Sequence, residues 1–91
     1  MALDYEITGA FDKDRNAMKK RNKEITLLRD VMSMLIQEKP LLPKHKNHPL
    51  KGKYKGKWEC HVEPDWLLTY RIDKKKNRVI FYRTGSHSDL F

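Results

Sequence analysis

Two histidines, a carboxylate and an arginine lie close together in the last third of the sequence. His61 precedes Asp65 by four residues, and Arg83 precedes His87 by the same spacing. Near neutral pH a histidine can both accept and donate a proton, and an arginine can stabilise a phosphate that gains negative charge. RNA cleavage needs these groups: a base for the 2′-hydroxyl, an acid for the leaving 5′-oxygen, and a cation for the phosphorane. The pattern therefore indicates chemistry on a polynucleotide backbone.

Three short strands should position these groups. Polar and apolar residues alternate over about residues 58–63, 66–72 and 78–84, as expected of half-buried strands, and polar turns separate the three segments. In an antiparallel meander, the end of one strand lies beside the start of the next. The four side chains should therefore converge at one end of the sheet, where Arg83 could pair with Asp65. The sequence alone does not bring His48 to this edge.

The first half of the chain predicts one strand and two helices. Leu3, Tyr5 and Ile7 alternate with polar residues, and Thr8-Gly9 offers a break before a helix that reaches about Lys20. A second helix is expected over about residues 22–38, where apolar residues recur at three- and four-residue spacing until Pro40 and Pro43. The fold class is therefore α+β in the order β-α-α-β-β-β, a single domain over residues 1–91 with two helices on one face of an antiparallel sheet.

Positive charge is concentrated in the second half of the chain. The 91 residues carry a formal net charge of +8. Residues 1–30 contribute seven Lys/Arg against six Asp/Glu (net +1), whereas residues 39–91 contribute thirteen against five (net +8), and Glu38 balances the sum. Such a basic half favours a polyanionic partner, with nucleic acid ahead of an acidic protein or an anionic membrane. The lysines concentrate in a connector with Gly52 and Gly56, at positions Lys44, Lys46, Lys51, Lys53, Lys55 and Lys57.

The sequence offers little for a disulfide, a membrane or a metal. Cys60 is the only cysteine, no apolar run approaches the roughly 20 residues of a bilayer span, and no signal peptide is visible. We therefore expect a cytoplasmic protein without cofactors. A zinc site from Cys60 and the histidines at 48, 61 and 87 is disfavoured, because close paired spacing is missing and Cys60 should face away from His61.

Three motifs resemble one known family. The segments 48–52 (HPLKG), 60–66 (CHVEPDW) and 83–91 (RTGSHSDLF) are similar to those of the YafQ branch of the RelE/ParE toxins. These proteins are the toxin halves of bacterial type II toxin–antitoxin modules. The resemblance covers nearly the whole chain, including both helices, and the three motifs together are more specific than any one of them.

The resemblance implies an endoribonuclease that enters the ribosomal A site and cuts translated mRNA. It also implies a cognate antitoxin that wraps the toxin, the complex binding operator DNA through the antitoxin to repress the shared operon. The catalytic residues implied are His48, His61, Asp65, Arg83 and His87. The expected contacts to mRNA and ribosomal RNA come from Lys51, Lys53, Lys55, Lys57, Trp66, Arg71 and Phe91.

Several of these residues also have simpler interpretations. Trp66 fits the core as well as a base-stacking platform, Asp65 could merely cap its turn, and His45 is expected to be exposed. A second hypothesis is a non-catalytic basic module of the same fold, which binds RNA or inhibits gyrase as ParE-like relatives do. That module would need no constellation of histidines, and this chain has one.

Overall fold

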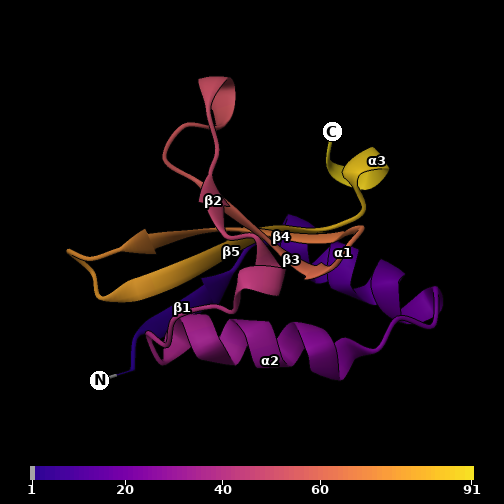
Figure 1. Ribbon diagram of the computed structural model, residues 1–91, viewed down its shortest axis with the longest axis horizontal. Coiled ribbons are helices and arrows are strands. Elements are labelled where there is room, and N and C mark those ends of the chain that lie inside the picture. The colour runs from indigo at the N-terminus through magenta and orange to yellow at the C-terminus, as the bar shows by residue number, and fades with distance from the viewer. Residues whose placement is uncertain (1) are drawn as a thin grey trace.

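Residues 2–91 are described by a computed structural model, in which five strands form one sheet in the order β1-β5-β4-β3-β2 (Figure 1). The predicted α+β class and element order are confirmed, and two short elements, β2 and α3, are added. Along the chain the elements are β1 (Asp4–Ile7), α1 (Gly9–Lys20), α2 (Ile25–Ile36), η1 (Pro43–His45), β2 (His48–Pro49), η2 (Gly52–Tyr54), β3 (Trp58–Glu63), β4 (Trp66–Asp73), β5 (Arg78–Gly85) and α3 (His87–Leu90).

The sheet is mixed, so the prediction of a wholly antiparallel sheet was wrong at one edge. Strands β2 to β5 pair antiparallel, but β1 pairs in parallel with β5, with Asp4 opposite Arg78 and Ile7 opposite Phe81. Hairpins impose antiparallel pairing on the meander. No hairpin constrains β1, because the chain leaves it through α1 and α2 and re-enters the sheet at the opposite edge.

Both helices pack on the same face of the sheet, as predicted. Thr8 caps α1, since its hydroxyl oxygen accepts a hydrogen bond from the Phe11 N–H at 3.0 Å. α2 is shorter than predicted, because positive backbone φ angles at Asn22 and Glu38 flank it. The core joins helix and sheet side chains, among them Phe11, Met18, Leu28, Val31, Leu35, Cys60, Trp66, Leu68, Tyr70, Val79 and Phe81. Within residues 2–91, no helix is long and apolar enough to cross a membrane.

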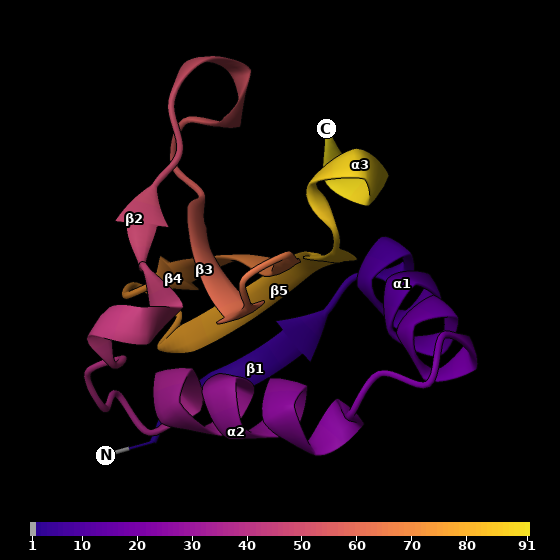
Figure 2. The same ribbon diagram turned by 45° about the vertical axis from the view of Figure 1, so that its right-hand side comes forward.

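The opposite face of the sheet carries two projecting segments. Figure 2 shows the β2–β3 hairpin with η2 and the short helix α3 rising from the side of the sheet away from α2. Ser86 caps the N-terminus of α3: its hydroxyl oxygen accepts from the Asp89 N–H, while the Asp89 carboxylate accepts from the Ser86 N–H. The hairpin and α3 therefore frame one open surface.

The end of β5 departs from regular pairing in a way that shapes this surface. β1 covers β5 only as far as Phe81. A bulge at Tyr82 then shifts the register, so that Arg83 lies opposite Thr69. Beyond β1, the side of β5 is covered by α1, because the Thr84 N–H donates to Asp14 Oδ2 at 3.2 Å. Thr84 itself is buried, and its hydroxyl accepts from Trp66 Nε1 at 2.9 Å and donates to the Leu67 carbonyl at 2.8 Å.

Thr84→Val should destabilise the fold, because it keeps the side-chain shape but leaves the buried Trp66 N–H without an acceptor. An unpaired buried donor costs about 1–3 kcal/mol, so the free energy of unfolding should fall by about that amount in urea denaturation. Thr26→Val on α2, where the threonine is exposed, is the matched control and should change the free energy of unfolding little. Equal stability of both variants would show that the Trp66–Thr84 bond contributes nothing.

Candidate active site

His87 and Asp65 form a contact pair at the edge where β4 begins. Asp65 Oδ1 accepts hydrogen bonds from the His87 backbone N–H at 3.3 Å and from its Nδ1 at 3.2 Å. The hydrogen bonds from His87, the backbone one foremost, lower the pKa of Asp65, so the carboxylate stays ionised near neutral pH. Because an ionised carboxylate only accepts, Nδ1 of His87 carries a proton, and Nε2 is the ring atom left for a substrate.

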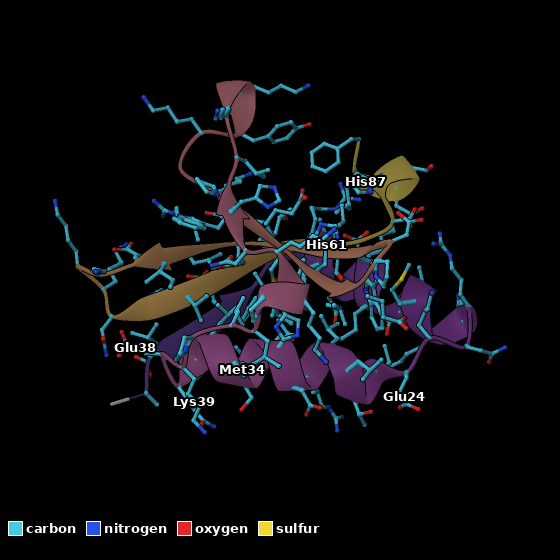
Figure 3. The ribbon with its side chains drawn as sticks, viewed as in Figure 1. Glu24, Met34, Glu38, Lys39, His61 and His87 are labelled. Carbon is cyan, nitrogen blue, oxygen red and sulfur yellow. The ribbon has the colours of Figure 1, made fainter. Side chains whose placement is uncertain are left out.

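His61 is held by the turn that follows it. Its Nδ1 lies 3.0 Å from the Pro64 carbonyl oxygen, and a carbonyl only accepts, so Nδ1 is protonated and a neutral His61 has its lone pair on Nε2. The ring centroids of His61 and His87 are 6.1 Å apart. Figure 3 shows the two side chains close together on the side of the sheet away from α2. The predicted convergence of His61, Asp65 and His87 is confirmed.

Arg83 does not pair with Asp65, and that prediction was wrong. Its Nε donates to Asp14 Oδ2 at 2.6 Å and its Nη2 to Asp14 Oδ1 at 3.1 Å. The Asp14 carboxylate raises the pKa of Arg83, chiefly through these hydrogen bonds, so the guanidinium is a permanent cation. The bulge at Tyr82 and the approach of α1 account for the difference. Arg83 still reaches the open surface, where it lines a cleft with Leu90 and Phe91.

A second ion pair links α1 to α3, and its residues were missed from the sequence. Arg21 directly follows α1, and its two terminal nitrogens donate to both carboxylate oxygens of Asp89, at 2.7 and 2.9 Å. The Arg21 guanidinium, followed by the Ser86 N–H, holds the pKa of Asp89 well below its usual value. Asp14 on α1 and Arg21, the residue that caps its C-terminus, are seven positions apart, which puts them on one side of the helix. That spacing is the only signal that the sequence contains.

His48 lies on β2, which pairs with the strand that carries His61. β2 pairs with β3 so that His48 is opposite Glu59. Its Nδ1 is 2.7 Å from the Lys46 carbonyl oxygen, and its Nε2 is 3.5 Å from Glu59 Oε1. Glu59 is buried, and no motif in the sequence singles it out. In the described part of the chain, no ring contact joins His48 to His61 or His87.

The structure decides the open alternative for Trp66 and corrects the expectation for His45. Trp66 is fully buried among the core residues, so it cannot serve as a base-stacking platform without leaving the core. His45, expected to be exposed, is only 5% exposed, and its Nδ1 accepts from the Leu42 N–H at 3.1 Å. Burial lowers the pKa of His45, with a smaller contribution from Lys44. Both residues are structural parts of the fold.

The predicted RNA-contacting residues other than Trp66 are accessible. The hairpin lysines Lys51 and Lys55 are exposed, Lys53 lies 5.2 Å from the centre of the Tyr54 ring, and Lys57 lies 4.2 Å from that of Tyr82. Arg71 and Phe91 are exposed as well.

His61, Asp65 and His87 thus lie together at one edge of the sheet, and comparison with known proteins shows the family of the chain. The family model for the bacterial toxin of type II toxin–antitoxin systems, YafQ, matches residues 3–91. The chain belongs to the YafQ toxin family. It is 43% identical over 89 residues to the mRNA interferase toxin YafQ of Escherichia coli strain K12, and the match covers 97% of this chain and 95% of the relative.

Solved structures of the YafQ family have the same fold. A metal-bound toxin from Helicobacter pylori is 46% identical, with a TM-score of 0.92, and the match covers 98% of this chain and 99% of that one. A chain of the E. coli DinJ–YafQ toxin–antitoxin complex is 39% identical, with a TM-score of 0.90, and the match covers 100% of this chain and 99% of that one.

The similar toxin from Helicobacter pylori is metal-bound, which raises the question of whether the donor groups near the histidine pair could hold a metal. Among residues 2–91, no group of three His, Cys, Asp or Glu side chains could hold a metal ion. Cys60 is buried among the core residues beneath the helices, and burial raises the pKa of its thiol to about 12. The described side chains therefore do not fit a metal centre.

Arg21→Met should loosen α3 and lower the activity that depends on His87. The pair is exposed, so global stability should change little. Amide hydrogen exchange of residues 87–90 should speed up, and cleavage of mRNA in a translation extract should slow. Arg15→Met, which removes the neighbouring α1 ion pair with Asp12, is the matched control. Unchanged exchange in α3 would show that the pair does not fix this helix.

Proposed function

We propose that this chain is an mRNA interferase toxin: an endoribonuclease that cuts translated mRNA in the ribosomal A site and is neutralised by a cognate antitoxin. The observation that carries the proposal is the His61–His87 pair, in which each ring has its Nδ1 hydrogen-bonded to an acceptor and its Nε2 free. Membership of the YafQ family supports it, since a relative with 43% identity is the E. coli mRNA interferase toxin YafQ.

His61 acts as the base in this mechanism and His87 as the acid. Nε2 of His61 takes the proton of the ribose 2′-hydroxyl, and the 2′-oxygen attacks the adjacent phosphorus. The bond from phosphorus to the 5′-oxygen breaks, and Nε2 of a protonated His87 donates its proton to that oxygen. The products are a 2′,3′-cyclic phosphate and a 5′-hydroxyl. Positioned proton transfers of this kind typically contribute about 10²–10⁴-fold each.

The charged neighbours supply orientation and stabilisation. Asp65 accepts from both the backbone N–H and Nδ1 of His87, which orients the ring. Nε and Nη2 of Arg83 donate hydrogen bonds to Asp14, whereas its Nη1 makes no hydrogen bond to any residue from 2 to 91. We assign this nitrogen to the phosphorane oxygens, where positive charge is worth most. His48 is assigned to the same substrate surface.

The basic hairpin is assigned to RNA. Lys51, Lys53, Lys55 and Lys57 all lie in or beside η2, on the hairpin that projects from the same side of the sheet as α3 (Figure 2). Phosphate contacts by such lysines are independent of base sequence and weaken as salt rises. This suits a protein that must dock on ribosomal RNA while reading a short stretch of mRNA.

Membership of the YafQ family supports the proposal that this chain has a cognate antitoxin. The DinJ–YafQ complex of E. coli contains a chain that matches this one along its full length. We propose that an antitoxin of the same kind binds this chain, and that the complex contacts operator DNA through the antitoxin.

Induction of this protein without an antitoxin should stop translation before replication. The alternative is a non-catalytic basic module, such as a gyrase inhibitor of the same fold. Pulse labelling with an amino acid and with thymidine after induction separates the two. Amino-acid incorporation should fall first if mRNA is cut, whereas an earlier fall in thymidine incorporation would support the gyrase-type target.

His87→Gln should abolish cleavage while leaving the fold intact. Glutamine is similar in size and keeps a donor, but it transfers no proton near neutral pH. Cleavage by the wild type should fall as pH rises through the pKa of the acid and fall again as pH drops through that of the base. Primer extension on a translated reporter mRNA should show a loss of about 10²-fold or more for His87→Gln.

The matched control is Ser88→Ala, which changes the exposed neighbour of His87 on α3 and should cut normally. His61→Gln should lose cleavage too, with its residual rate no longer falling at low pH. Circular dichroism checks that each variant folds. Wild-type cleavage by a folded His87→Gln protein would show that the proton comes from another group.

A further inference from the structure

Trp58, at the start of β3, is exposed on the face of the sheet that the helices cover elsewhere. Side chains alternate between the two faces along a strand, so Trp58 shares a face with Cys60 and lies opposite to His61. Cys60 is fully buried in the core, whereas Trp58 is 39% exposed. The helical layer therefore covers Cys60 and stops short of Trp58, and the acid–base mechanism gives this tryptophan no role.

The exposed indole opens onto a hollow of about 320 Å³. Ile72, which is 37% exposed, lines the same hollow. A second hollow of about 350 Å³ continues from it along the end of α2, and the two share Asn47, Tyr70, Ile72 and Lys74. We call the two hollows together the Trp58 groove. Neighbouring apolar side chains that stay exposed within a polar rim mark an interaction surface.

The rim of the Trp58 groove is mainly positive. Arg71 and Lys74 line the first hollow, and none of the described residues that line it is acidic. Lys39 and Glu38 face each other's charge in the second hollow, and Asp73 Oδ2 lies 3.9 Å from Arg71 Nη2. The β4–β5 turn, to which Lys74 belongs, lies at the end of the sheet away from α3 (Figure 1). The groove therefore attracts an anionic partner at a distance from the histidine pair.

An exposed aromatic ring beside cations suits single-stranded nucleic acid, because bases stack on the ring while phosphates face the cations. An acidic protein segment would also pair with Arg71 and Lys74. Its carboxylates would gain nothing from the indole, however, since the face of an aromatic ring is the negative side of its quadrupole. A nucleobase uses both the ring and the cations, so the groove favours RNA.

We propose that the Trp58 groove binds one unpaired base of ribosomal RNA, stacked on the Trp58 indole, with the flanking phosphates on Arg71 and Lys74. The inference rests on the proposed function and adds to it a second RNA contact, on the face of the sheet opposite to the substrate. Because His61 lies on the other face, the groove stays open while mRNA occupies the acid–base pair. The mRNA is already held at that pair, so the base comes from the ribosome.

The simpler role for Trp58 is to close the end of the core. Trp58→Phe keeps an aromatic face, whereas Trp58→Leu keeps an apolar side chain and removes that face. Arg71→Gln removes a rim charge without touching the core. The matched controls are Tyr5→Leu, which changes an exposed aromatic residue on β1, and Lys75→Gln, which changes an exposed lysine of the β4–β5 turn that does not line the groove.

The experiment measures binding to ribosomes programmed with mRNA that carries 2′-deoxynucleotides in the A-site codon, so that binding is not followed by cleavage. Trp58→Leu should raise the dissociation constant about 5- to 150-fold, as expected for one base–aromatic stack, and Trp58→Phe should raise it less. Arg71→Gln should reduce the slope of log K against log salt by about 0.7–0.9. Tyr5→Leu and Lys75→Gln should bind like the wild type.

Chemical probing of the same complexes identifies the occupant. The wild type should protect one unpaired ribosomal RNA base that Trp58→Leu leaves reactive, while Trp58→Leu should bind the antitoxin as tightly as the wild type does, which also shows that it folds. Ribosome binding by Trp58→Leu at wild-type strength would overturn the proposal. So would an unchanged pattern of protected bases, or a loss of affinity for the antitoxin alone, which would assign the groove to a protein.

Failure of the proposed function has a different signature. The wild type would then bind the programmed ribosomes and leave ordinary mRNA uncut on them, while the comparison of Trp58→Leu with the wild type would still decide whether the groove holds ribosomal RNA. A wild type that does not bind ribosomes at all would overturn both proposals.

Discussion

The carboxylate of Asp14 on α1 is the contact on which the open surface depends. Strand β1 stops at the level of Phe81, so the last part of β5 would expose unpaired backbone on that side. Asp14 fills this position by accepting from the Thr84 N–H and from two nitrogens of Arg83. Together with the Thr8 hydroxyl, which donates to the Tyr82 carbonyl at 2.8 Å, the Asp14 side chain completes this edge of the sheet and orients Arg83.

Arg21 extends the same support to α3. The helix has only four residues, too few to be stable by itself, and it carries His87. Its attachment consists of the Ser86–Asp89 capping box, the Arg21–Asp89 ion pair and the contact between Asp65 and His87. The capping box lies within α3 and its cap, Arg21 follows α1, and Asp65 belongs to the β3–β4 turn. The position of His87 therefore depends on three separate segments.

The sequence predicted the β3–β4–β5 meander and the side chains that it brings together. Period-2 alternation located β3, β4 and β5, and hairpin geometry alone brought His61, Asp65 and His87 together. It failed where a contact joins distant segments: Asp14 and Arg83 are 69 positions apart, and no local pattern predicts either their pairing or the bulge at Tyr82. β2 has two residues, too few for a periodic signal, so the place of His48 could not be foreseen.

The exposure of the His87 and Asp65 side chains fits the proposed action on ribosome-bound mRNA. The side chains of His87 and Asp65 are 60% and 73% exposed, and charges in that setting are screened by water. RNA and ribosome would cover these groups, remove the water and strengthen the same interactions. His48, His61 and His87 each have Nδ1 next to an acceptor, from Lys46, Pro64 and Asp65 respectively. The fold therefore holds each ring through Nδ1, and the rings differ both in that acceptor and at Nε2: Glu59 faces Nε2 of His48, whereas RNA is proposed to face Nε2 of His61 and of His87.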